Sequence, residues 1–195
     1  EVESILKGVI WDLKKTSNGD LLITSTTGLA IWRNGRSKPE AISKLGPYTT
    51  KQLASTGFQS VTEDSQGRIW LGTGTLGAIR WDRINDEVII FRSDQDNENS
   101  INSDDVHYAF EDSRKNIWFG YHRRGISLGY SNPWEYEYVL PNEQAGPGDA
   151  SNRVYSMVED NKDNLWYSTT DKLVMQPVNG EPESYDLPEP GSRLD

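Results

Sequence analysis

The side chains with the widest chemical use lie together in one short segment. His122 stands in the run Tyr121-His122-Arg123-Arg124. Two neighbouring guanidinium groups can bind carboxylates or sugar hydroxyls, and the ring of Tyr121 offers a surface on which a ligand can stack. Arginine pairs are also common as plain solvated surface. We therefore treat this run as a candidate ligand contact.

A second group of candidates recurs along the chain at intervals of 48 residues. Trp11, Gln59, His107 and Tyr155 share one position of a repeat, and each is large and capable of polar contacts. These four residues differ while the position before them stays apolar, which is typical of side chains at a channel mouth; ordinary packing is the alternative. Arg153 could complete the same rim. The candidate ligand-binding residues are therefore Trp11, His107, Tyr121, His122, Arg123, Arg124, Arg153 and Tyr155.

Metal and cofactor sites have little support. The chain has two histidines and no cysteine, which excludes thiolate sites and disulfides and argues against a histidine-rich metal site. The acidic segment 94–105 spaces its oxygens as a calcium loop would, but it lacks the glycine and the closing glutamate of such a loop. Segment 72–77 matches G-x-G-x-x-G, yet strand-like residues follow where a dinucleotide site needs a helix. We expect no metal and no cofactor.

An internal repeat defines the elements that must position these residues. A Glu-Asp pair, a turn and Ile-Trp or Leu-Trp occur three times, with tryptophans at 70, 118 and 166, and a looser copy surrounds Leu22. Each copy contains four short strands separated by turn residues. In the second copy we predict strands at 58–63, 68–73, 77–82 and 87–92.

A period of 48 residues with four strands is the size of a β-propeller blade. We predict an all-β fold of about four such blades in one domain over 1–195, with each tryptophan packed between neighbouring blades. Asp64, Asp112 and Asp160 begin turns and should accept backbone N–H groups. Three equivalent copies do not make one active site, so these acids are not expected to act in acid–base chemistry. The blades are predicted at about 9–43, 58–92, 106–140 and 154–187.

Charge and composition limit the partners. A net charge of −10 argues against a nucleic-acid surface, and no stretch approaches the 18 apolar residues of a membrane span. Seventeen glycines and nine prolines in 195 residues suit many turns. The sequence begins at Glu1 without the pattern of a signal peptide, so we expect an internal or processed segment.

The repeat, with its Glu-Asp-Ser turn, Ile-Trp strand and following glycines, resembles the two-component regulator propeller repeat. The Ser- and Asn-rich linker 93–106 is similar to that family's lead into the next blade. The first copy departs from the pattern, with Lys15-Thr16 in place of the Glu-Asp pair. This resemblance implies a periplasmic sensor ectodomain, usually a seven-bladed propeller. It also implies a later β-sandwich, a membrane helix and a histidine kinase or diguanylate cyclase module.

Four blades form either a closed ring or an arc of a larger propeller, and we favour the arc. The resemblance implies a sensing domain that binds a small extracellular ligand, for which a carbohydrate is our expectation. It would work with the rest of the sensor polypeptide and not as an enzyme. Two alternatives stay open. One is an interaction scaffold that includes a homodimer, and the other is a propeller lyase with His107 or His122 as general base.

Overall fold

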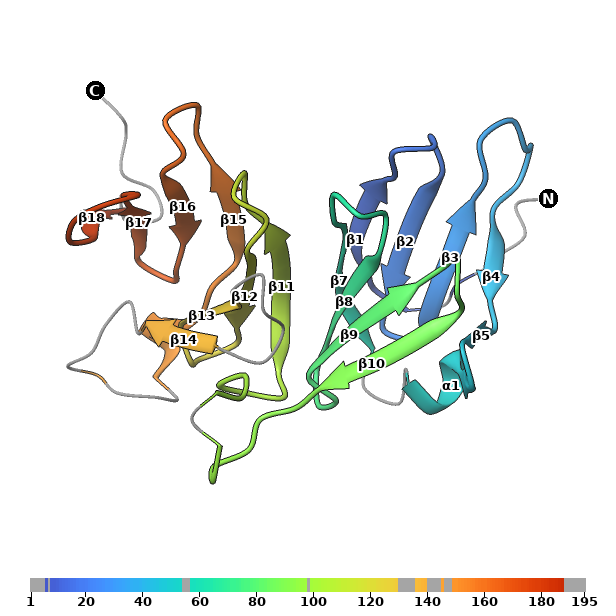
Figure 1. Cartoon of the computed structure of the whole chain (residues 1–195), viewed down its shortest axis with the longest axis horizontal. Helices are drawn as coiled ribbons and strands as arrows, with labels where there is room; N and C mark the ends of the chain where they lie inside the picture. The colour runs from blue at the N-terminus through green and yellow to red at the C-terminus, as the bar shows by residue number, and fades with distance from the viewer. Residues whose placement is uncertain are drawn as a thin grey trace.

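The computed structural model describes residues 6, 8–53, 57–97, 99–129, 136–139, 145 and 149–187. These residues form four four-stranded antiparallel sheets, each of which follows the chain from its first strand to its last (Figure 1). The all-β fold and its blades of four antiparallel strands are therefore confirmed. Parts of the third predicted blade, 130–135 and 140, lie outside the described residues, as do 188–195.

The strands of the second sheet lie within one residue of the predicted ranges. The sheets consist, in chain order, of β1 (Ile10–Lys15), β2 (Leu21–Ser25), β3 (Gly28–Trp32) and β4 (Glu40–Ile42); β7 (Phe58–Glu63), β8 (Ile69–Thr73), β9 (Ala78–Asp82) and β10 (Glu87–Phe91); β11 (Val106–Glu111), β12 (Ile117–Tyr121), β13 (Ile126–Gly129) and β14 (Tyr136–Val139); and β15 (Ser156–Glu159), β16 (Leu165–Ser168), β17 (Lys172–Gln176) and β18 (Glu183–Asp186). The linkers add the two-stranded sheet of β5 (Lys44–Leu45) and β6 (Tyr48–Thr49), the helical turn α1 (Thr50–Leu53) and the 3-10 turn Ala150–Asn152.

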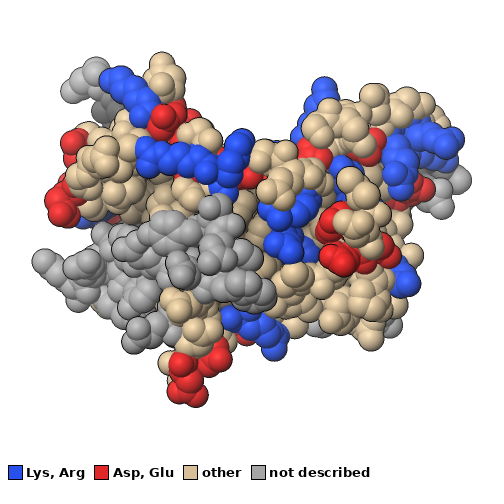
Figure 2. Space-filling view, viewed as in Figure 1, with Lys and Arg blue, Asp and Glu red and all other residues tan. Residues whose placement is uncertain are grey.

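The first strand of each sheet is the innermost one. β1 contacts β7, β7 contacts β11 and β11 contacts β15, so the blades follow one another around a common axis. The ring is open: Figure 1 shows the first and fourth blades at the two ends of the arc, and the outline in Figure 2 is indented between them. The alternative of a closed four-bladed ring is thus excluded.

Exposed apolar residues mark both ends of this arc. Ile10 and Leu13 of β1 are 45% and 57% exposed, whereas their equivalents in the second blade, Phe58 and Val61, are 0% and 3% exposed. At the other end, Val158 of β15 is 58% exposed. Each end of the arc thus exposes apolar residues. The residues of the second blade that correspond to Ile10 and Leu13 are covered by a neighbouring blade.

The hydrophobic cores lie between blades rather than within them. Trp70 is buried and stacks on Phe91, with ring centroids 5.3 Å apart, and both pack against Val106 and Phe119 of the following blade. Trp70, and Trp118 against the fourth blade, thus pack between neighbouring blades as predicted, whereas Trp166 stacks on Tyr185 of its own blade. A flat aromatic ring buries a large area in such a position and fixes the distance between two sheets.

The aspartate of each repeat holds its turn, as predicted. Asp64 Oδ1 accepts the backbone N–H groups of Gln66 at 3.0 Å and Arg68 at 2.9 Å, and Oδ2 accepts the indole N–H of Trp70 at 2.8 Å. One carboxylate therefore satisfies the turn and also fixes the orientation of the tryptophan ring.

The same contacts recur in the third and fourth blades. Asp112 accepts the indole N–H of Trp118, and Asp160 that of Trp166, both at 2.9 Å. The indole of Trp166 and the amide of Asn164 hold the pKa of Asp160 far below its ordinary value of 3.8. The Asp160 carboxylate is thus ionised at neutral pH, and all three aspartates act as hydrogen-bond acceptors within their blades.

The glutamate of each pair joins two blades. Glu111 accepts the backbone N–H of Ser65 at 2.7 Å and its hydroxyl at 3.0 Å, and Glu159 bonds Ser113 in the same way at 2.8 and 2.9 Å. Lys15 occupies the corresponding position in β1. The two acids of the repeated pair therefore have separate structural tasks, one within a blade and one between blades.

Candidate functional site

A cavity of about 750 Å³ lies where the inner strands begin. All four blades contribute to its lining, with Trp11 from β1, Gln59 from β7, His107 from β11 and Tyr155 from the residue before β15. The structure thus brings the complete variable column of the repeat to one surface. Arg153, from the linker before β15, lines the same cavity.

β-Bulges turn three of these side chains toward the cavity. Ile10 and Asp12 of β1 face consecutive residues of β2, which leaves Trp11 as the extra residue of the inner strand. The pairing of β7 with β8 and of β11 with β12 shifts in the same way at Gln59 and His107. A bulge rotates its extra residue away from the regular alternation of a strand. Phe58 and Val106, the residues before Gln59 and His107, are buried in the core while the bulged residues line the cavity.

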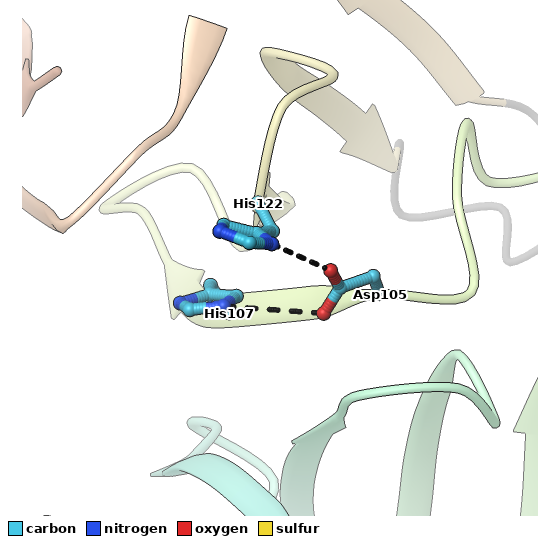
Figure 3. Close-up of side chains that lie close together, drawn as sticks. All are labelled: Asp105, His107 and His122. Atoms are coloured by element: carbon cyan, nitrogen blue, oxygen red, sulfur yellow. Dashed lines mark hydrogen bonds and ion pairs between the residues drawn. The ribbon is translucent and has the colours of Figure 1, made fainter. Parts of the chain in front are cut away.

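Asp105, His107 and His122 form a compact cluster at the cavity wall (Figure 3). Asp105 Oδ2 lies 3.1 Å from His122 Nδ1, and Asp105 Oδ1 lies 3.9 Å from His107 Nε2. The two imidazole rings stack with centroids 4.8 Å apart. Gln59 Nε2 donates a hydrogen bond of 3.2 Å to Asp105 Oδ1 and so holds the carboxylate from the neighbouring blade.

The electrostatics of this cluster favour a neutral His107. Burial lowers the pKa of His107 below its ordinary value of 6.5; the Asp105 carboxylate opposes this shift, and His122 and Arg153 add to it. The imidazole of His107 is therefore uncharged at neutral pH. A neutral ring can accept a hydrogen bond or bind a metal through its free nitrogen.

Arg153 and Tyr155 form the opposite part of the lining. The Arg153 guanidinium lies 5.7 Å from the centre of the Tyr155 ring and donates a bond of 3.3 Å to its hydroxyl. Within the part of the chain that the structure describes, Arg153 Nε and Gln59 Oε1 are buried without a hydrogen-bond partner. Both residues line the cavity, which thus has one cationic and one neutral amide side chain in its wall.

Five of the eight candidate residues from the sequence line this cavity, and three do not. Tyr121 is a correction: its side chain is fully buried between the second and third blades, and its hydroxyl accepts the backbone N–H of Asn102 at 3.2 Å. The next residue, His122, points into the cavity instead (Figure 3). Arg124 borders a different hollow beside the linker, and Arg123 is exposed away from the cavity lining.

Sequence reasoning missed Asp105 as a site residue. It counted this carboxylate among the acidic residues of a loop that resembles a calcium site, whereas the described residues of 94–100 form no cluster of potential ligands. A signal was present. Asp105 and Arg153 occupy the same repeat position, and each stands two residues before a column residue. In the structure Asp105 lies beside His107, and Arg153 lies beside Tyr155.

Two segments of the chain, 52–75 and 148–171, match the two-component regulator propeller family. The chain carries two-component regulator propeller repeats. Each matched propeller repeat covers an inner strand, the turn held by its aspartate, and the strand with its tryptophan. No curated protein matches the sequence. The repeats support a sensing propeller domain.

Solved structures with the same fold belong to several kinds of protein. Virginiamycin B lyase from Staphylococcus aureus matches with a TM-score of 0.68 and 14% identity, over 94% of this chain and 57% of the lyase. Extracellular domains assigned to two hybrid two-component systems of B. thetaiotaomicron match with TM-scores of 0.66 and 0.61 and identities of 15% and 16%. They are covered over 21% and 29% of their length, and this chain over 88% and 89%.

These identities show the propeller fold alone, and the chain spans 57% or less of each of these three proteins. Among the described residues, no helix has the length and apolar character that crossing a membrane requires. The match to the regulator propeller family is consistent with an extracytoplasmic domain.

Proposed function

We propose that this domain senses a small ligand on the extracytoplasmic, periplasmic side of a membrane and that the cavity between the four blades binds it. The proposal rests on the observation that residues from all four blades line this cavity. Trp11, Gln59, His107 and Tyr155 come from four different blades yet face one cavity of about 750 Å³. A ligand held by all four blades can change how they pack, and such a change can be passed to an output module.

A carbohydrate is the ligand class that fits the lining. Trp11 and Tyr155 are exposed aromatic rings on which the apolar face of a sugar can stack. Arg153 and Gln59 also line the cavity, and a guanidinium and an amide are groups that can bond the hydroxyl or carboxylate groups of a sugar. By analogy with the regulator propeller family, the rest of the polypeptide would carry a kinase or cyclase module.

Another hollow, of about 330 Å³ between the third and fourth blades, is a weaker candidate. Asp112 and Glu159 line it, but Asp112 is already bonded to Trp118 and Glu159 to Ser113. Its polar groups therefore serve the turns and the blade contacts. The cavity beside His107 instead has the guanidinium of Arg153 and the exposed rings of Trp11 and Tyr155 in its lining.

Binding of a sugar should depend on the cavity side chains. In calorimetric titrations of the 195-residue chain with neutral hexoses, hexuronic acids and their disaccharides, we expect at least one saturable ligand. Arg153→Ala and Trp11→Ala should each weaken it by about 10- to 100-fold, because each change removes a charged hydrogen bond or a stacking surface. Arg124→Ala and Trp32→Phe, which change exposed residues outside the cavity, should bind as the parent chain does.

Two results would contradict this function. One is a panel in which no sugar binds, or binding that survives both cavity substitutions. The other is chemical conversion of the bound sugar during the titration, which would favour the lyase alternative and should then be lost when either histidine is replaced.

We also propose that further blades of the same polypeptide cover the two apolar ends of the arc. Phe91, on the second blade, is 6% exposed because the third blade packs on it, whereas its equivalent Leu187 is 42% exposed. These end surfaces therefore match the surfaces that blades bury against each other. This chain covers only 57% and 21% of two of the similar solved structures, whose greater length supports further blades as the partners of these end surfaces.

The isolated chain should consequently self-associate through its ends. We expect its mass in solution, measured by light scattering, to rise with concentration, and Leu13→Asp or Val158→Asp to reduce the association. Ile84→Asp, at an exposed turn away from both ends, is the matched control. A strictly monomeric chain would contradict the proposal, and a dimer that persists after further blades are added would identify a second copy as the partner.

A further inference from the structure

The geometry points to a metal site: we propose that Asp105, His107 and His122 bind one divalent transition-metal ion of the zinc class. This inference deepens the proposed function, because the three residues lie in the wall of the same cavity. Figure 3 shows both imidazole rings beside one carboxylate, with each ring near a different oxygen.

The distances are close to those that a metal requires. One potential ligand atom from each of the three residues lies within 4.8 Å of the others, and the closest pair, Asp105 Oδ2 and His122 Nδ1, is 3.1 Å apart. Ligands at about 2.0–2.2 Å from a tetrahedral Zn²⁺ ion stand about 3.3–3.6 Å from one another. The three side chains are half-buried, and the two imidazole rings, now stacked with an interplanar angle of 24°, have to turn so that one nitrogen of each points at the ion.

The ligand set selects the class of metal. Two imidazoles and one carboxylate suit Zn²⁺ and similar transition metals, whereas Ca²⁺ and Mg²⁺ prefer oxygen ligands alone. The Gln59 amide bonds the Asp105 carboxylate and orients it, as groups around a metal site commonly do.

The charges around the cluster also bear on the metal. Asp105 faces both imidazoles, and Asp12 lines the same cavity, while Arg153 is the nearby positive group. The Arg153 guanidinium lies over the Tyr155 ring and bonds its hydroxyl, and its positive charge opposes a cation at the cluster while the two carboxylates favour one. The chain as a whole carries a net charge of −10, which raises the local concentration of cations.

Three protein ligands leave at least one position of the metal free. Because the cluster lines the cavity, that position can face a molecule bound there. A water or an oxygen of the ligand, such as a sugar hydroxyl or carboxylate, would complete the coordination. All three protein ligands belong to the third blade or to the linker before it, so the site does not depend on how the ring closes.

Titration of the 195-residue chain with Zn²⁺ and with Co²⁺ tests the inference. We expect one ion per chain, a visible Co²⁺ absorption band of tetrahedral type, and a rise in melting temperature with Zn²⁺. His107→Ala, His122→Ala and Asp105→Asn should each weaken binding at least about tenfold. Asp96→Asn, the same charge change on an exposed linker residue, should have no effect and measures nonspecific binding to the acidic surface.

Melting curves of every variant in EDTA verify that the variants are folded before binding is compared. A chain that binds no ion in a saturable way would overturn the inference, as would one-to-one binding that persists when both histidines are replaced. Sugar titrations repeated in EDTA separate the two proposals. Sugar binding without metal binding refutes the metal site alone, and metal binding without any sugar ligand refutes the sugar site alone.

Discussion

Replacing Gly77 by alanine is expected to destabilise the domain by about 3 kcal/mol or more, whereas the same replacement at Gly67 should cost about 1 kcal/mol. Both glycines have left-handed backbones, with φ of +80° and +78°. They differ in space: a Cβ at Gly77 would stand 1.9 Å from the carbonyl oxygen of Phe91, and a Cβ at Gly67 would meet nothing within 4 Å. Urea unfolding of both variants measures the difference.

The repeat itself supplies the control for this prediction. Lys115 and Asp163 occupy the position of Gly67 in the third and fourth blades, with φ of +73° and +63°. Gly67→Asn should therefore cost less than about 1 kcal/mol, since asparagine adopts this conformation readily. Equal stability of the alanine variants at Gly67 and Gly77 would contradict the close approach of Gly77 to the carbonyl oxygen of Phe91.

Replacing Asp64 by alanine should cost about 3 kcal/mol, because the carboxylate is buried and serves several donors at once. It accepts two backbone N–H groups of the turn, the indole N–H of Trp70, and the Arg68 Nε–H at 2.6 Å. Removal leaves the buried indole N–H without an acceptor. The free energy of unfolding in urea is the measurement.

Two further variants sharpen this second prediction. Asp96→Ala removes an exposed carboxylate and should change stability by less than about 0.5 kcal/mol. In Asp64→Asn, the amide keeps only one of the two acceptor oxygens, so its cost should lie between these two values. An Asp64→Ala protein as stable as Asp96→Ala would show that the aspartate does not hold the blade.

The sequence predicted the blades well because their signals are local. The strands of the second blade, the turn held by Asp64 and the burial of Trp70 depend on residues within one repeat. Such spacing and turn chemistry can be read along the chain. The contact from Glu111 to Ser65 was not foreseen, since it joins residues of two different blades.

The candidate site was predicted in part. The variable column could be located because the repeat aligns Trp11, Gln59, His107 and Tyr155, but the bulges that turn three of them toward the cavity leave no mark in the sequence. Tyr121 was assigned wrongly because the last residue of β12 still points into the core between blades. One residue later the chain leaves the strand, and His122 faces the cavity.

The proximity of His107 and His122 was also not predicted, because it depends on tertiary structure. A count of two argued against a metal site, yet His107 at a bulge and His122 in a hairpin loop come together with Asp105 through the folding of one blade. A low number of histidines argues against a metal site only if the histidines lie far apart in the fold. Here tertiary structure decides which few residues share one surface.

The position of a bound sugar is the most direct test of the central claim that the cavity between the four blades is a ligand site. A crystal structure of the chain with its tightest carbohydrate ligand should show the sugar against Trp11 or Tyr155, with a polar group within hydrogen-bond distance of Arg153. A sugar seated outside this cavity, with these three side chains free of it, would contradict the account.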